Sequence, residues 1–430
     1  MTTTKKSNYA LPIAMMFALF FMISFVTGLQ NPFGVIVKDQ FSASNFLSQL
    51  GNLANFIAYA CMGIPAGIML KRLGYKKTAL WAIIVGFVGV GITLLSGIAE
   101  SFAVYLVGAF VSGFSMCMLN TVVNPMLNSL GKNEKQGNQL IQFGGACNSI
   151  GATIVPVLIG YLMGSNVEAN QIADANPALF IAMGIFALAF IVLSLTRIPE
   201  PHLALSSQKS AQKETHSAWS FRHFIFGIIT IFIYVGVEVG IPNIANLYMT
   251  EDLGAGGLEM DEAIAGTLCG TYWFLMFIGR LVGGLIGGKV SSKVMLSATT
   301  AIGALFVLLA MFINPSATVN MPVFNSNLSF GLQNVPTSIM FLILCGLCTS
   351  VMWGSIFNLA TSGLGRFTEM ASGIFMMMVC GGGILPIIQG RIADSAGFLN
   401  SYWLIFAGFI FMMMYALVFS KNVNKDIVTE

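Results

Sequence analysis

Long apolar runs recur along the whole chain and restrict its fold more than any other feature. Each run is about 18 to 28 residues long, enough for a helix to cross a hydrocarbon core about 30 Å thick. Of the 430 residues, 56% are hydrophobic and only 9% are charged, whereas about a quarter of the residues in soluble domains are charged. A β-barrel would instead show short segments of alternating hydrophobicity. The pattern predicts an all-α integral membrane protein that crosses the bilayer repeatedly.

The runs divide into two sets of six. No small-residue cleavage site follows the first run, so we interpret it as a retained helix and not as a signal peptide. The hydrophilic stretch 197–223 separates the two sets and has the composition of an exposed connection. We therefore predict an N-terminal six-helix bundle (1–196), a cytoplasmic linker (197–220) and a C-terminal six-helix bundle (221–430). The twelve expected spans are 10–37, 46–70, 78–98, 103–130, 139–163, 177–196, 223–248, 263–288, 294–313, 335–363, 371–392 and 400–420.

The distribution of positive charge predicts the orientation. Of the 20 Lys and Arg residues, all but three fall on the same side of the predicted bilayer as the N-terminus. The exceptions are Lys38 and Arg391 on the opposite side and Arg280 within a span. Since Lys and Arg are enriched in cytoplasmic loops, we expect both termini to be cytoplasmic and the protein to lie in the inner (plasma) membrane.

The two predicted halves share matched spacings. In 67–76 and in 284–293 a Gly is followed by cations five and nine residues later. In 124–131 and in 358–365 an Asn precedes a Gly by seven residues, and 151–160 and 381–390 share a Gly-Pro-Gly pattern. Two homologous halves with a substrate site between them near the midplane are typical of secondary transporters.

Enzymatic and metal chemistry are disfavoured. All seven cysteines lie in predicted spans, and the Cys345–Cys348 pair has no His or acid nearby, so we interpret these residues as helix-packing residues. The sequence has no phosphate-binding loop, no zinc-ligand spacing and no nucleophile–base set. We expect a monomer with no metal, no cofactor and no nucleic-acid partner, which is neither an enzyme nor ATP-driven.

Glu238 lies in the middle of an apolar span. The nearest charges along the chain, Arg222 and Glu251, are roughly 24 Å and 20 Å away along a helix. Burial favours the neutral form of a carboxyl group, so a permanently protonated structural acid is one interpretation. Intramembrane acids more often mark an ion or proton pathway. We therefore predict that Glu238 couples transport to H⁺ or Na⁺.

Several segments resemble a known family. The loop at 67–76 is similar to the loop signature of the major facilitator superfamily, with Lys71 where that signature usually has Asp. Within the superfamily, 120–131, 148–156, 234–239, 279–280 and 372–394 resemble the fucose/glucose/galactose–proton symporter family. The resemblance covers nearly the whole chain and implies two six-helix bundles that transport a hexose-like sugar by alternating access.

The sequence departs from this family at informative positions. Where the fucose branch has acids in spans 1 and 4, this chain has Asn31 and Asn120. Glu238 matches the acid of the glucose/galactose branch, so the chain resembles that branch more closely. The Gln expected in span 5 is replaced by Gly145, and a Phe-Pro-Thr pattern in span 10 reads Trp353-Gly354-Ser355.

Neutral polar and aromatic residues form the predicted substrate site. Buried amides and hydroxyls must be satisfied within the membrane, and hydrogen bonding between helices is the alternative role for each one. The polar set lies in spans 1, 4, 5, 7 and 10, which line the central cavity in the family, and amides suit a neutral polyhydroxyl ligand. Aromatic rings can cover the apolar faces of a sugar. The polar residues, together with the aromatic residues Tyr272, Trp273 and Trp353, give the predicted site: Gln30, Asn31, Asn120, Asn124, Gln142, Asn148, Tyr234, Asn243, Asn246, Tyr272, Trp273, Trp353 and Asn358.

Cations form the predicted gate. The resemblance implies that Lys71, Arg72, Lys76 and Lys289 close the cytoplasmic side, although these loop cations also set the topology. Arg280 lies roughly 13 Å inside the cytoplasmic end of its span, and Glu238 some 10 Å deeper. We therefore do not expect Arg280 to pair with Glu238, and predict that Arg280 packs at the inner gate or extends toward the cytoplasm.

Taken together, these features predict a secondary active transporter for a small neutral sugar, coupled to H⁺ or Na⁺ through Glu238. One alternative is an uncoupled uniporter or exporter of a sugar or other neutral solute, in which Glu238 is structural. Another is a membrane receptor or lipid-handling protein that has kept the fold, although the mid-membrane amides argue against a lipid path.

Overall fold

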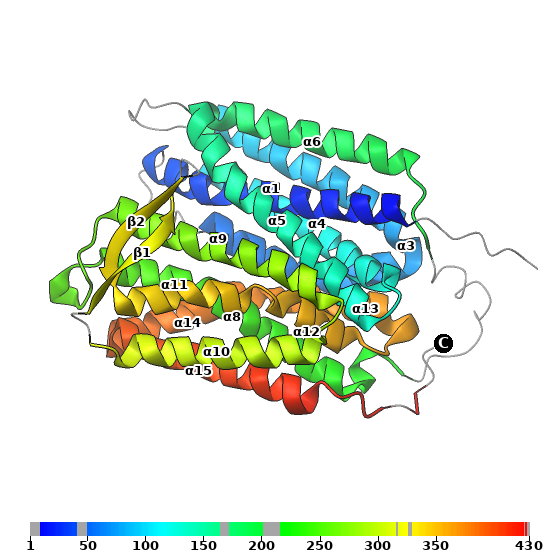
Figure 1. Ribbon diagram of the computed structural model, residues 1–430. Coiled ribbons are helices and arrows are strands. Elements are labelled where there is room, and N and C mark those ends of the chain that lie inside the picture. The colour runs from blue at the N-terminus through cyan, green and yellow to red at the C-terminus, as the bar shows by residue number, and fades with distance from the viewer. Residues whose placement is uncertain are drawn as a thin grey trace, which may run out of the picture.

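The computed structural model describes residues 9–40, 50–163, 172–200, 216–314, 317–325, 329–424 and 426–427. Within these ranges, the side-chain surroundings of 28–39, 52, 156–163, 173–174 and 262–263 are left out of the description. The chain is helical over most of its length (Figure 1), as expected where every backbone N–H and C=O must be satisfied away from water.

The helices of the first half are α1 (Ala10–Gln40), α3 (Leu50–Ile98), α4 (Phe102–Leu130), α5 (Glu134–Met163) and α6 (Asn176–Leu195). Those of the second half are α8 (Arg222–Thr250), α9 (Glu262–Gly287), α10 (Ser292–Phe312), α11 (Thr337–Thr349), α12 (Met352–Thr361), α13 (Thr368–Met377), α14 (Gly381–Ala396) and α15 (Phe398–Met414). Short helical turns lie at Ile172–Ala175, Ala218–Ser220, Leu253–Ala255, Gly365–Phe367, Met378–Cys380 and Tyr415–Phe419.

Ten helical stretches in the described part of the chain are long and apolar enough to cross a membrane. One of them, Leu53–Ile98, has 46 residues and turns back at Gly74, so it combines two predicted spans. The 30-residue helix α5 is more polar and is not among the ten. Because length and composition alone define these stretches, the number of twelve crossings stays a prediction.

The turn within α3 illustrates how the sequence shapes the fold. Gly74 has φ 81°, a left-handed conformation that glycine adopts without steric cost. The Glu200 carboxylate accepts hydrogen bonds from the backbone N–H groups of Tyr75 and Lys76, both at 2.8 Å. An acid at this position satisfies amides at the start of the second arm of α3 and matches the positive end of its dipole.

The segment 314–336 contains the only strands in the described part of the chain. Strands β1 (Thr318–Phe324) and β2 (Phe330–Pro336) pair antiparallel, with Pro322 opposite Leu332. The Phe324 ring stacks on Phe274 of α9 with centroids 4.3 Å apart, and the Phe324 N–H donates to Thr271 Oγ1 at 2.9 Å. The hairpin is therefore fixed against α9 (Figure 1).

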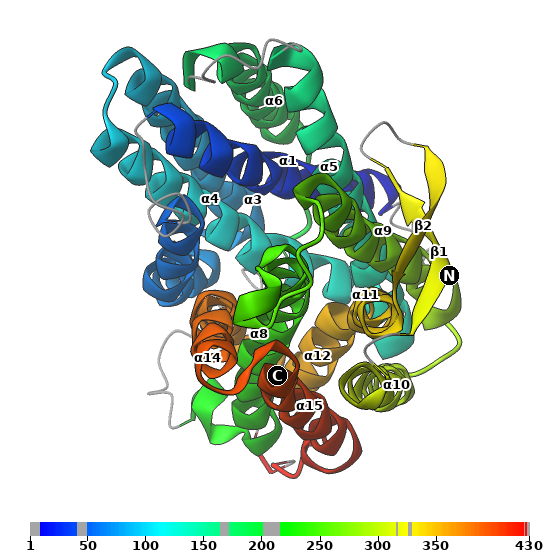
Figure 2. The same ribbon diagram turned by 90° about the vertical axis from the view of Figure 1, so that its left-hand side faces the viewer.

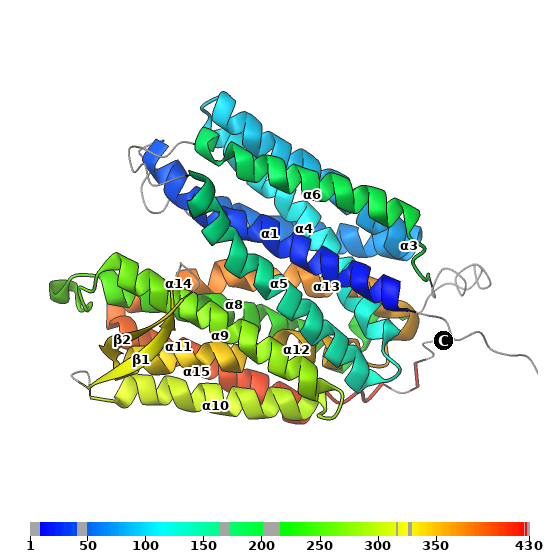
Figure 3. The same ribbon diagram turned by 45° about the horizontal axis from the view of Figure 1, so that its top comes forward.

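The helices form two groups, α1 to α6 and α8 to α15 (Figure 2). We call the end that carries Lys71, Lys135 and Lys289 the inner end, which the charge distribution predicts to be cytoplasmic, and the end with the β-hairpin the outer end. The two groups lie close together at the inner end and diverge toward the outer end (Figure 3). The exact boundaries of the two predicted bundles stay a prediction, and most of the linker lies outside the described residues.

The most extensive contacts between the groups are made by α3 with α13 and by α5 with α9. In the first, the α3–α13 seam, a Cβ added to Gly63 would lie 2.5 Å from the Met377 nitrogen and 2.6 Å from the Gly373 oxygen. In the second, the α5–α9 seam, the Gln139 amide donates to the Gly284 carbonyl at 2.9 Å. The first seam is a close approach of two backbones, whereas the second contains hydrogen-bonding side chains.

Candidate functional site

Glu238 lies in α8, and its backbone carbonyl has an unusual partner. Pro242, four residues later, has no N–H to donate to that carbonyl. The Tyr272 hydroxyl, from α9, donates to it instead at 3.0 Å. The proline thus frees a polar group in the apolar span, and the predicted site residue Tyr272 satisfies it.

The Glu238 carboxylate is buried and has two donors. Its Oε1 atom accepts a hydrogen bond from the Tyr234 hydroxyl at 3.0 Å, one helical turn earlier on the same face of α8. The same oxygen lies 3.2 Å from Nη2 of Arg280, and the two charged side chains are only 11% and 12% exposed. Within the described residues, Glu238 is thus a paired intramembrane acid that contacts α9.

The expectation that Arg280 would not pair with Glu238 is wrong. That expectation compared heights along ideal helices that were assumed to end at the same level. Packed helices are tilted and staggered, and the guanidinium lies several ångströms from its own Cα atom. The structure brings Arg280 into direct contact with Glu238, so Arg280 belongs to the site around the acid.

Arg280 also contacts the first helix group. Its Nη1 atom donates to the Ser149 hydroxyl at 2.7 Å and to the Gly145 carbonyl at 3.3 Å. Both acceptors are in α5. One guanidinium therefore contacts the acid of α8 and a helix of the opposite group.

A second polar cluster joins α4 to α12. The Trp353 indole N–H donates to the Asn124 side-chain oxygen at 3.0 Å, and the Asn120 amide donates to the Tyr59 hydroxyl at 2.8 Å. The Trp353 ring lies edge-on to Tyr234, with centroids 6.4 Å apart, which joins this cluster to the one around Glu238. Tyr59, a lone hydroxyl in the apolar second span, was missed by the sequence analysis.

Three predicted substrate-binding amides have their side chains occupied by protein contacts. Gln142 donates to the Val351 carbonyl at 2.8 Å across the groups, and Asn148 donates to the Phe20 carbonyl of α1 at 3.2 Å. Asn358 donates to the Asn128 side chain at 2.8 Å and accepts from the Ser292 hydroxyl at 2.9 Å. Asn358 also donates to the backbone carbonyl at the start of α5, so it lies at the inner end.

The remaining predicted binding residues make no hydrogen bond to these clusters among the described residues or lie outside the described side chains. Asn243 is exposed, and Trp273 is 37% exposed with its ring edge-on to Tyr272. Asn246 accepts a weak hydrogen bond from the Cys269 thiol at 3.8 Å. Gln30 and Asn31 are in α1 but outside the residues whose side chains the structure describes.

The predicted gating cations have different environments. Lys289 offers its backbone carbonyl to the Lys135 ammonium at 2.9 Å across the α5–α9 seam. Lys76 donates to the Ser194 carbonyl at 2.7 Å, which keeps it within the first group. Arg72 is exposed. The positive charge of Lys71 interacts with Glu369, a buried acid at the start of α13.

Glu369 was not among the predicted site residues, because the eleventh span was expected to begin at residue 371. Helix α13 begins at Thr368, and Glu369 is only 3% exposed. A Cβ added to Gly67 of α3 would lie 3.2 Å from the Glu369 carbonyl oxygen. Glu369 therefore belongs to the α3–α13 seam.

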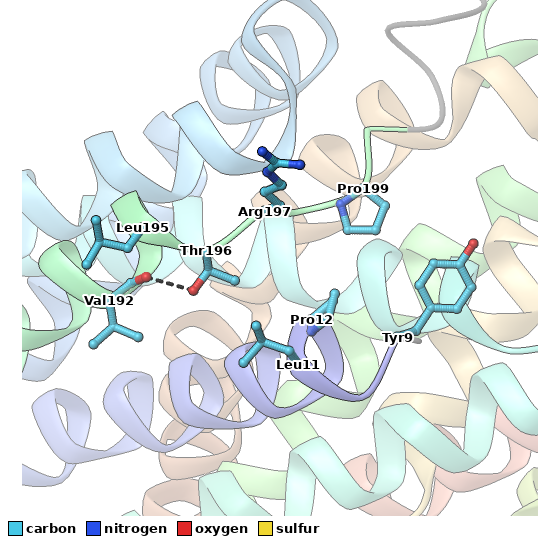
Figure 4. Close-up of a pocket in the computed structure, with 8 residues that line it drawn as sticks. All are labelled: Tyr9, Leu11, Pro12, Val192, Leu195, Thr196, Arg197 and Pro199. Carbon is cyan, nitrogen blue, oxygen red and sulfur yellow. Dashed lines mark hydrogen bonds between the residues drawn. The ribbon is translucent and has the colours of Figure 1, made fainter. Parts of the chain in front are cut away.

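A hollow between the start of α1 and the segment after α6 is separate from these clusters (Figure 4). It is lined by Tyr9, Leu11, Pro12, Val192, Leu195, Thr196, Arg197 and Pro199. The Thr196 hydroxyl donates to the Val192 carbonyl at 2.7 Å, so it does not donate a hydrogen bond into the hollow. The hollow shares no residue with the predicted substrate site.

Comparisons with known proteins agree with this architecture. A family model described as the Major Facilitator Superfamily matches residues 16–385. The glucose/galactose transporter of Brucella abortus is 28% identical over 427 residues, covering 98% of this chain and 97% of the relative. The L-fucose–proton symporter of Escherichia coli is 24% identical, covering 91% of this chain and 88% of the relative.

Solved structures show the same fold. The fucose–proton symporter of E. coli matches with a TM-score of 0.80 at 21% identity, covering 96% of this chain and 100% of that one. A second structure, of FucP in the outward conformation, also gives a TM-score of 0.80, at 22% identity and with the same coverage. The predicted superfamily and its helical membrane fold are confirmed, while the number of twelve crossings stays a prediction.

Proposed function

The chain belongs to the Major Facilitator Superfamily, and on that basis we propose that it carries a monosaccharide across the inner membrane by alternating access, driven by H⁺ or Na⁺ through Glu238. Its relatives are named as transporters, and the chain is a multi-pass membrane transporter and not an enzyme. In this transport cycle, residues 1–196 and residues 221–430 form two bodies that rock against each other.

The observation that carries the proposal is the Arg280–Glu238 contact at 3.2 Å within the second helix group, made by an arginine that also contacts α5 of the first group. A buried ion pair holds only while both partners are charged, since an isolated charge in a low-dielectric interior is costly. A proton or Na⁺ that reaches Glu238 competes with Arg280 for the same carboxylate. Cation binding then changes the contacts of Arg280, as coupling requires.

The sugar assignment rests on side-chain chemistry and on the relatives. Asn120, Asn124, Tyr234 and Trp353 form one connected cluster of amides, a hydroxyl and an aromatic face. Amides donate and accept hydrogen bonds, and aromatic rings cover apolar faces. The relatives are named as glucose/galactose and L-fucose transporters, which supports a hexose-like substrate.

We assign the predicted binding residues to two levels. Asn243, Asn246 and Trp273 lie on the outer side of Glu238 along α8 and α9, where a sugar from outside would arrive. Gln142 and Asn358 hydrogen bond across the two groups toward the inner end, so we assign them to the inner closure together with Lys289. This division corresponds to a transporter closed toward the cytoplasm.

The test is uptake into proteoliposomes under an imposed ΔpH or ΔNa⁺, with glucose, galactose and fucose as substrates. We expect one gradient to drive accumulation of at least one sugar in the wild type, and not in Glu238→Gln. Asp394→Asn, at an exposed acid of α14, is the matched control and should accumulate sugar normally. Intact accumulation by Glu238→Gln contradicts the coupling role, and no uptake of any sugar contradicts the substrate class.

A second candidate is an uncoupled uniporter or exporter. It is favoured by the same ion pair, because Arg280 neutralises Glu238 within the protein and could hold it ionised throughout the cycle. In that case sugar equilibrates without accumulation, and imposed gradients leave the rate unchanged.

A further inference from the structure

We propose that Arg280 is a positioning residue that links the charge of Glu238 to the contact between the two helix groups, through an acceptor site on α5 formed by the Gly145 carbonyl and the Ser149 hydroxyl. This inference deepens the proposed coupling role of Glu238 and rests on it. We refer to the two acceptors together as the α5 acceptor pair.

The geometry of the guanidinium supports this link. Nη2 faces Glu238 at 3.2 Å, while Nη1 donates to Ser149 at 2.7 Å and to Gly145 at 3.3 Å. The guanidinium is planar and rigid, so its two nitrogens cannot be reoriented independently. The position of the group at Glu238 therefore determines whether the other nitrogen reaches α5.

Gly145 provides the space for this arrangement. A Cβ at this position would lie 3.3 Å from Cδ of Arg280 and 3.5 Å from its Nε. The first distance is tight, so the arginine would have to shift slightly for an added methyl group, and we expect a branched side chain such as Val to push it away from α5. The residue that replaces the Gln of the resembled family is thus the one that lets Arg280 lie against the α5 backbone.

The neighbouring contacts make this link part of a longer closure. Nearer the inner end of the same seam, Gln139 donates to the Gly284 carbonyl at 2.9 Å, and a Cβ on Gly284 would meet the Phe143 ring at 2.7 Å. The Arg280 link lies next to these contacts, on their outer side along α5 and α9. Loss of the Arg280 link should therefore weaken the part of the α5–α9 seam that lies between Glu238 and the inner end.

The sign of the effect follows from the charges. Within the described residues, the charged or titratable groups that face Glu238 are Arg280 and Tyr272 from α9 and Tyr234 from α8 itself. The α5 groups near Arg280 are neutral.

When Glu238 is ionised, Arg280 is held between the acid and α5. When Glu238 binds a proton, Arg280 loses its counter-charge, and a buried unpaired cation is driven toward water. Protonation therefore releases α5 and favours opening of the inner end.

The experiment measures hydrogen–deuterium exchange of the purified full-length protein at one fixed pH, by mass spectrometry of peptides covering 131–139. Glu238→Gln imitates the protonated acid without a change of pH. Ser149→Ala removes the shorter α5 contact, and Gly145→Val displaces Arg280. Hydrogen bonds to charged groups are among the stronger ones, so we expect about tenfold faster exchange in this region for Glu238→Gln. Smaller increases are expected for the two α5 variants.

The matched control is Thr153→Ala, one turn further along α5, where the hydroxyl donates to the Ser149 carbonyl and makes no contact with Arg280 among the described residues. This control should exchange like the wild type. If Glu238→Gln and Ser149→Ala also exchange like the control, the link is refuted. If the variants exchange faster but the wild type shows no cation-driven uptake, the link stands and the proposed function fails.

Discussion

The two seams that join the helix groups differ in chemistry. At the α3–α13 seam, Gly63 and Gly67 allow the two backbones to meet, with Gly373 opposite them. At the α5–α9 seam, contact is made through Arg280 and through amide side chains. The close approach of these glycine backbones depends on shape, although the seam also contains the buried acid Glu369. The α5–α9 contact includes a charged side chain, and we propose that it is the seam that a cation switches.

Among the substitutions at the two seams, removal of Arg280 should have the largest effect on stability and transport. Arg280→Gln leaves a buried carboxylate without its partner, which typically costs about 3–5 kcal/mol. We expect a strong loss of stability in thermal unfolding and no transport. The double variant Glu238→Gln/Arg280→Gln buries no charge and should recover most of the stability. Equal stability of the single and double variants would show that the two groups do not interact.

The glycine seam can be tested by adding one methyl group. Gly63→Ala puts a Cβ about 2.5 Å from the Met377 nitrogen, and backbone cannot yield as a side chain can. Overpacking of this kind costs about 1–3 kcal/mol, so we expect lower thermal stability and faster hydrogen exchange at 368–377. Gly184→Ala, with nothing within 4 Å of the added Cβ, is the control and should be neutral or stabilising. A neutral Gly63→Ala would mean that this seam is not closely packed.

The hydrogen bond between Trp353 and Asn124 should have a moderate effect. Trp353→Phe keeps an aromatic ring but loses the indole N–H, and a neutral hydrogen bond contributes about 1 kcal/mol. A double-mutant cycle with Asn124→Ala should give a coupling energy of that size, measured by unfolding. Trp273→Phe is the control, since the Trp273 indole has no hydrogen-bond partner among the described residues. A coupling energy near zero would show that the Trp353–Asn124 hydrogen bond does not help to hold the two helix groups together.

The smallest effect is expected at the second buried acid. Glu369 lies in the α3–α13 seam and is not among the described partners of Arg280, so Glu369→Gln should leave cation-driven uptake within about twofold of the wild type. If Glu369 bound the coupled proton, its loss would shift the pH dependence of uptake, and a shift of one pH unit corresponds to about a tenfold change in the uptake rate. Uptake rates as a function of pH distinguish these results. A lost pH dependence would assign the coupling role to Glu369 as well.

Much of the architecture could be predicted from the sequence, because membrane spans depend on local composition. The long apolar runs indicated the helical fold, and the turn at Gly74 falls in the predicted loop between spans 2 and 3. Tyr234 and Glu238, four residues apart, necessarily share a helix face. The hairpin at Thr318–Phe324 and Phe330–Pro336 could not be predicted, because its stability depends on Phe274 and Thr271, which are distant in the sequence.

The candidate site was only partly predictable for a related reason. The importance of Glu238 followed from its own span, but its pairing with Arg280 depends on how two helices are staggered. Tyr59 and Glu369 gave weak signals, since a single hydroxyl or an acid near a span end is common. Whether an amide such as Gln142 or Asn358 faces a ligand or another helix depends on tertiary packing, which spacing along one helix does not contain.

The most direct test of the central claim compares two modes of transport in Glu238→Gln. Exchange of sugar across proteoliposomes that contain equal sugar on both sides needs the binding site and alternating access but no net cation movement. Accumulation against a sugar gradient needs coupling. The account predicts that Glu238→Gln keeps exchange and loses cation-driven accumulation, while the wild type performs both. If Glu238→Gln accumulates sugar as the wild type does, Glu238 is not the coupling residue.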